Sequence, residues 1–99
     1  MMVAFDEVVE KITDAVRHVE ADAGASPVLV AVVGEFQAKL AKARKHATGG
    51  VPDRDFVVEL EQAGDSAKVA AEADAGLSSD ARESVLAAHL AICTLKAGA

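Results

Sequence analysis

Large aromatic side chains are scarce in this chain, which has three phenylalanines and neither tyrosine nor tryptophan among its 99 residues. Hydrophobic residues nevertheless make up 52% of the sequence, which excludes an intrinsically disordered chain. Much of this fraction is alanine, the residue with the highest helix propensity. The composition therefore favours closely packed helices that bury little area per residue, in a single domain over residues 1–99.

The chain also has a single cysteine, few basic residues and no long apolar run. The single cysteine excludes an internal disulfide, which fits a reducing compartment. The formal net charge of −6 disfavours a nucleic-acid partner, because such binding depends on Lys and Arg against phosphates. No apolar run is long enough to cross a bilayer, and Asp6, Glu7 and Glu10 stand where a signal peptide needs a basic flank. We therefore expect a cytoplasmic protein that binds neither nucleic acid nor membrane.

Apolar residues recur every three or four positions, which is the spacing of an amphipathic helix. The pattern predicts helices over about residues 3–22, 27–47, 54–74 and 79–97. Ser26 before Pro27 is typical of a helix start, and glycines follow the predicted helices. Four such helices joined by short loops predict an all-α, antiparallel four-helix bundle.

Three details of this organisation depend on single residues. Gly64 lies inside the third pattern, so residues 54–74 form either one continuous helix, which we favour, or two short helices that meet at Gly64. The fourth helix starts either at a capping box that begins with Asp80, or at Ser78 or Ser79. The two halves are helical pairs of similar length whose residues do not match, so we expect no internal duplication.

His89 and Cys93 are spaced as i and i+4, which places them on one face of the last helix. A helical wheel puts both near the middle of the apolar sector, between Ile92 on one side and Leu90 on the other. A buried cysteine acts as a small hydrophobe, and a buried histidine is normally neutral and hydrogen-bonded. We interpret the pair as core packing. The alternatives are a redox-active or regulatory thiol, and a metal site that a second subunit completes.

A complete set of ligands or catalytic groups is not visible elsewhere. Zinc usually needs four protein ligands, or three with an open position, whereas His18 and His46 fall on the polar faces of other helices. The carboxylates also fall on polar helix faces, where such groups ordinarily lie. We expect no metal, no cofactor and no enzymatic activity.

Basic residues gather in the last turns of the second helix: Lys39, Lys42, Arg44 and Lys45. Cations at a helix C-terminus complement the helix dipole, and we favour this structural interpretation. If the patch binds a partner, we expect a cluster of protein carboxylates. Asp6, Glu10 and Asp14 on the first helix are candidates, from the same chain or from a second copy.

These observations favour a protein that works by association, either as a self-assembling bundle or as an adaptor for another protein. Many small side chains leave one bundle poorly filled, and an oligomer adds buried surface. We expect the alanine-rich faces of the third and fourth helices to pair with another subunit. Val57, Val58 and Val69 lie off the main apolar stripe of the third helix and need cover.

The alternative is a carrier or relay protein that is modified on Ser66 or on a histidine. The stretch QAGDSAKV, residues 62–69, is similar to the attachment motif of acyl carrier proteins. That resemblance implies a serine at a helix start that carries a phosphopantetheine arm, although Ala67 stands where the family has a bulky aliphatic residue. For phosphate relay, His46 beside Lys42 and Lys45 departs from the order of residues in histidine phosphotransfer domains.

Overall fold

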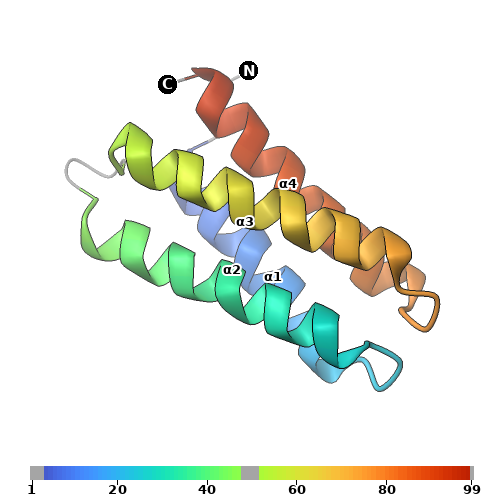
Figure 1. Cartoon of the computed structure of the whole chain (residues 1–99). Helices are drawn as coiled ribbons and strands as arrows, with labels where there is room; N and C mark the ends of the chain where they lie inside the picture. The colour runs from blue at the N-terminus through green and yellow to red at the C-terminus, as the bar shows by residue number, and fades with distance from the viewer. Residues whose placement is uncertain (1–3, 48–51, 99) are drawn as a thin grey trace.

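The structure, a computed structural model, describes residues 4–47 and 52–98. Over these ranges the chain forms helices only, namely α1 (Phe5–Ala21), α2 (Pro27–Lys45), α3 (Arg54–Ala73) and α4 (Ser79–Gly98). Consecutive helices run antiparallel, and the α1–α2 and α3–α4 loops lie together at one end of the bundle (Figure 1). The four-helix bundle that the sequence predicts is confirmed.

Each helix packs against two neighbours. Both α1 and α3 contact α2 and α4, so within the described residues α1 lies diagonally opposite α3 and α2 lies opposite α4. The core fills the space between them, and its largest fully buried side chains are Phe36, Ile12, Leu29, Leu60 and Ile92. Each packed pair of helices presents one outer face of the bundle, and two of these faces, the α2/α3 face and the α1/α4 face, lie on opposite sides.

Serine side chains cap the two helices that follow the short loops. The Ser26 hydroxyl accepts the backbone N–H of Leu29 at 3.2 Å, as predicted. At α4 the cap is Ser78, whose hydroxyl accepts the N–H of Ala81 at 3.2 Å. None of the described helices is both long enough and apolar enough to span a membrane.

The third helix continues through Gly64 without a break, as favoured above. Gly64 is buried, and a Cβ added there would lie 3.4 Å from the His89 ring and 3.5 Å from the Phe36 ring. Packing of the large Phe36 ring against α3 therefore compensates for the weak helix propensity of glycine, which costs about 1 kcal/mol relative to alanine. The predicted helix start at residue 3 and the glycines at 49–50 lie outside the described residues.

The expectation that the chain has no internal duplication is wrong. Residues 20–26 (EADAGAS) and 72–78 (EADAGLS) differ only at Ala25 and Leu77, and both segments end one helix and begin the next. The spacing of 52 residues, from position 20 to position 72, carries α1 onto α3 and α2 onto α4. Along the helices the repeat preserves burial more than identity, so that buried Val8 corresponds to buried Leu60. Residue matching along the helices therefore did not reveal it.

The two repeated loops bind each other reciprocally, as across a two-fold axis. Asp22 Oδ2 accepts the N–H of Ser78 at 2.9 Å, and Asp74 Oδ2 accepts the N–H of Ser26 at 2.8 Å. The other oxygen of each carboxylate accepts the N–H of the glycine two residues further on, at 2.9 and 3.1 Å. These bonds, above all the one from the serine of the other loop, hold the pKa of both aspartates below its ordinary value.

Candidate functional site

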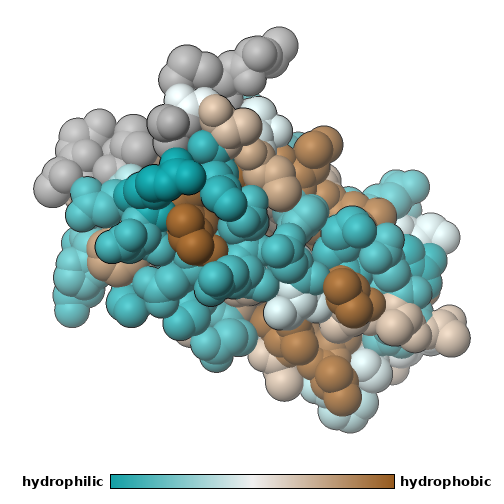
Figure 2. All heavy atoms as spheres, turned by 45° about the horizontal axis from the view of Figure 1, so that its top comes forward, coloured by the Kyte–Doolittle hydropathy of each residue, from teal (hydrophilic) through white to brown (hydrophobic). Residues whose placement is uncertain are grey.

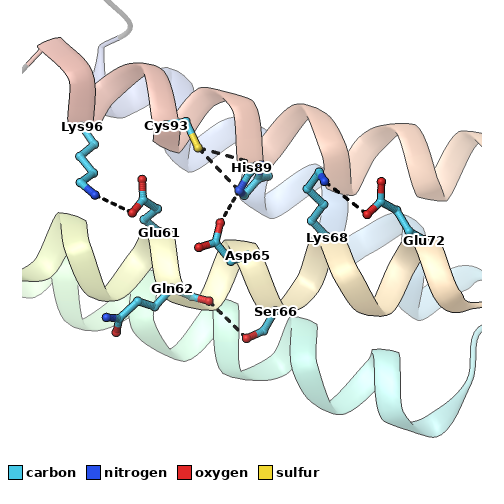
Figure 3. A network of polar contacts seen from close by, with 9 residues as sticks. All are labelled: Glu61, Gln62, Asp65, Ser66, Lys68, Glu72, His89, Cys93 and Lys96. Carbon is cyan, nitrogen blue, oxygen red and sulfur yellow. Dashed lines mark hydrogen bonds and ion pairs between the residues drawn. The ribbon is translucent and has the colours of Figure 1, made fainter.

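Polar side chains link α3 to α4 in the network that Figure 3 shows. His89 Nε2 contacts Asp65 Oδ1 at 2.5 Å, and Cys93 Sγ lies 3.6 Å from the same ring nitrogen. Two turns along α4 from His89, the Lys96 ammonium pairs with Glu61 at 2.7 Å. Two carboxylates of α3 therefore hold a histidine and a lysine of α4.

The prediction that His89 and Cys93 lie near the middle of the apolar face is wrong. Both residues are half-buried, and the His89 side chain is 18% exposed. Ala88 and Ile92 occupy the buried centre, whereas Leu90, which was expected to border the pair, is 67% exposed. The helix is apolar over a wide arc, and only the positions of α1 and α3 decide which part of that arc is covered.

The geometry does not prepare Cys93 for nucleophilic chemistry. A cysteine nucleophile needs thiolate character and an adjacent base. Burial, reinforced by the negative charges of Glu61 and Asp65, raises the pKa of the Cys93 thiol, so the uncharged thiol prevails at neutral pH. When the Nε2–H of His89 donates to Asp65, the free acceptor is Nδ1, which lies 4.0 Å from the Cys93 sulfur.

The other histidines lie apart from this network. His46 stacks on Phe56 with 5.0 Å between ring centroids, and His18 Nδ1 lies 2.8 Å from the carbonyl oxygen of Asp14. In residues 4–47 and 52–98, no three His, Cys, Asp or Glu side chains are grouped so as to hold a metal ion.

The basic residues of α2 fall into two pairs. Lys39 and Lys42 reach across to α3, where their ammonium groups lie 3.2 and 3.6 Å from Glu59 Oε1. The pKa of the Glu59 carboxyl is lowered, and the hydrogen bond from Lys39 is the largest cause. Arg44 and Lys45 are exposed. Within the chain the basic patch thus meets Glu59 of α3 and, at the longer distance of 3.9 Å, Glu35 of α2 itself. The predicted candidates, in contrast, lie on the first helix.

An open apolar groove of about 500 Å³ lies between the start of α2 and the end of α3. Its walls include Val28, which is 68% exposed, and Val69, which is 65% exposed. Small or polar residues complete the lining, namely Asp65, Ser66, Ala70 and Ala73. On the side of the molecule in Figure 2, hydrophobic side chains form separate patches within a mostly hydrophilic surface. Val28 falls outside the predicted association residues, and its only signal in the sequence is an extra valine at the start of the second helix.

The internal repeat shows what the fold itself requires at these positions. The residue that corresponds to Val28 in the other half is Asp80, and the residue that corresponds to Val69 is Arg17. Asp80 and Arg17 are exposed and charged at equivalent places on the α1/α4 face. The bundle therefore does not need valine at either place, which makes the exposed pair candidates for a contact outside the chain.

The remaining predicted association residues divide between core and surface. Val57 is 1% exposed and needs no cover from outside the chain, Val58 is half-buried, and Val69 alone is largely exposed. Ser66 is exposed in the interior of α3, where its hydroxyl donates to the carbonyl oxygen of Gln62 at 3.3 Å. Its setting therefore differs from the helix start that the acyl carrier motif implies.

Comparison of the chain with protein-family models, with curated proteins and with solved structures gave no significant match.

Proposed function

We propose that this protein works by protein–protein association, and that self-association is the form that its surface favours. The observation that carries the proposal is the pair Val28 and Val69, two largely exposed valines that border one apolar groove. The equivalent positions of the other half carry the charged residues Arg17 and Asp80, so the bundle does not need valine there in order to fold. This comparison supports the proposal. Exposed apolar surface of this kind gains free energy when a partner covers it.

The chemistry of the polar network supports the same conclusion. Its cysteine is half-buried with a raised pKa, and its histidine is engaged by Asp65. These properties suit a network whose role is to hold α3 against α4. An adaptor that binds a different protein through the groove is the second form of the same proposal.

Sedimentation equilibrium of the wild-type chain over a wide concentration range tests self-association. We expect the average mass to rise from that of one chain towards that of two. A mass of one chain at every concentration contradicts self-association and leaves only the adaptor form, which binding to a purified candidate protein then has to demonstrate.

The carrier alternative has one observation in its favour, since the exposed Ser66 borders the apolar groove. A group attached to its hydroxyl would reach this groove directly. The denatured mass of protein purified from its own cells decides the matter. Added covalent mass on Ser66 or a histidine supports the carrier or relay function, and the mass of the bare chain contradicts it.

A further inference from the structure

We infer that the α2/α3 face is where two copies of this chain associate, side by side with their bundles parallel and a two-fold axis running along the groove. The inference rests on the proposed function and deepens it by naming the partner, the surface and the orientation. The α2/α3 face consists of two outward-facing stripes, one from each helix, whose members are exposed except for the half-buried ion pair of Lys39 and Glu59. That of α2 contains Val28, Ala31, Glu35, Lys39 and Lys42, and that of α3 contains Asp55, Glu59, Gln62, Ser66, Val69 and Ala73.

Each stripe has an apolar end and a charged end. Successive members are three or four residues apart and therefore lie on one side of their helix. Val28 and Val69 mark the apolar end, where they border the same groove. Lys39, Lys42 and Glu59 mark the charged end, where both ammonium groups contact the carboxylate. The charged part of α2 is mainly basic, and that of α3 is acidic.

The contacts within one chain also fix which residues lie at the same level along the bundle. Lys39 and Glu59 lie at one level because they form an ion pair at 3.2 Å, and Val28 and Val69 lie at another because they line one groove. A two-fold axis parallel to the helices leaves every level unchanged. It therefore places α2 of one copy against α3 of the other, with valines against valines and lysines against the partner's Glu59.

A two-fold axis that lies in the plane of the face but runs perpendicular to the helices does not achieve this match, because it reverses the levels of one copy relative to the other. If it passes through the centre of the face, it sets Lys39 and Lys42 over the partner's apolar groove, where their charges lose water without gaining a partner. If it passes through the groove, only the apolar ends of the two copies overlap. The parallel arrangement alone pairs both the apolar and the charged ends.

The area of the face also favours overlap along its whole length. The bundle measures 39 × 25 × 18 Å, so a face 39 Å long offers on the order of 700–1,000 Å². A standard stable interface takes about 800 Å² from each partner. Overlap of the apolar ends alone provides roughly half of that area, which is the size of a weak contact.

The first test compares two substitutions of exposed hydrophobic residues by lysine. Val69→Lys places a charge in the proposed interface, whereas Leu90→Lys makes the same kind of change on the α1/α4 face, where Leu90 is 67% exposed and borders a separate hollow. By sedimentation equilibrium we expect Val69→Lys to weaken the dimer by at least about tenfold and Leu90→Lys to leave it unchanged. Circular dichroism checks that both variants fold.

The possible outcomes separate the inference from the proposed function. A wild-type dimer that Val69→Lys leaves intact overturns the assigned surface and keeps self-association. A wild-type monomer overturns both the inference and self-association. A dimer weakened equally by both substitutions also contradicts the inference, because the matched change lies on the opposite face.

A mixing experiment tests the orientation. A chain with Lys39→Glu and Lys42→Glu carries negative charge on both stripes, and a chain with Glu59→Lys carries positive charge on the corresponding part of both. We expect each variant alone to dimerise poorly, and an equimolar mixture to form a heterodimer in native mass spectrometry. Repulsion inside each chain persists on mixing, so recovery reports contacts between chains. Two folded variants that do not combine would overturn the parallel arrangement.

Discussion

Gly24 and Gly76 meet backbone to backbone where the two repeated loops cross, with no room for a side chain on either. A Cβ on Gly76 would lie 2.5 Å from the carbonyl oxygen of Gly24, and a Cβ on Gly24 would overlap the carbonyl oxygen of Gly76. Backbone atoms cannot turn aside as a flexible side chain does. The close approach therefore makes glycine a requirement at both positions, and it brings the aspartates of each loop within reach of the serine N–H of the other.

Alanine at Gly76 should accordingly destabilise the bundle. We expect Gly76→Ala to lower the free energy of unfolding by about 1–3 kcal/mol, because the loops must separate to admit the methyl group. Gly34→Ala is the matched control, since a Cβ at this exposed helical position meets nothing within 4 Å. The control should raise the free energy of unfolding by about 0.5–1 kcal/mol. Urea titration measures both values, and equal effects would refute the close approach.

Replacement of Gly64 by alanine should change the free energy of unfolding in the opposite direction to the same replacement at Gly76. A Cβ at Gly64 would make ordinary contacts with the rings of His89 and Phe36, at 3.4 and 3.5 Å. The gain in helix propensity should therefore dominate, and we expect Gly64→Ala to stabilise the protein by about 0.5–1 kcal/mol. Gly64→Leu, which overfills the same space, should be destabilising. A large loss of stability with alanine would show that the α3–α4 contact is tighter than the structure indicates.

Acid should weaken the contact between the loops. The pKa values of Asp22 and Asp74 are lowered in the folded protein, chiefly by the N–H of Ser78 and of Ser26 respectively. The stabilisation is therefore fully present above the ordinary aspartate pKa of about 4 and is lost as the pH falls through the lowered values.

Thermal unfolding from neutral pH to about pH 2 measures this loss. We expect the melting temperature of a double Asp22→Asn, Asp74→Asn variant to depend less on pH than that of the wild type. Asp53→Asn serves as the control, because the Asp53 side chain makes no capping hydrogen bond. The same acid profile for wild type and double variant would exclude these two carboxylates as the cause.

Cys93 should react slowly with alkylating reagents in the folded protein. Burial and the neighbouring charges of Glu61 and Asp65 raise its pKa, which reduces the thiolate that reacts. We expect the alkylation rate of the native protein at neutral pH to lie well below that of the denatured chain. We also expect this rate to rise at a higher pH in the native protein than in the denatured chain. Mass spectrometry of timed iodoacetamide reactions gives both quantities. Rapid alkylation of the native protein would restore the redox or regulatory interpretation of Cys93.

Helix positions and ends were predictable because they depend on neighbours in the sequence. The spacing of Val8, Ile12 and Val19 marks the side of α1 that is buried, and Ser26 before Pro27 marks a helix start through bonds within one turn. Four helices with short loops then leave few arrangements other than an antiparallel bundle. The candidate site was less predictable from the sequence. The spacing of His89 and Cys93 indicated a pair, but nothing in the sequence indicated that Asp65 binds His89.

The sequence by itself thus determined the four helices, their approximate bounds and the fold class, because periodicity and capping act over a few residues. Only the tertiary structure decided that Leu90 faces outward, and only it separated exposed Val69 from covered Val57, since the covered arc of a helix depends on where its neighbours lie. It also revealed that the two EADAG segments bind one another, because residues 52 positions apart come together only after all four helices have packed. That same packing aligns the valines and the opposite charges along the α2/α3 face.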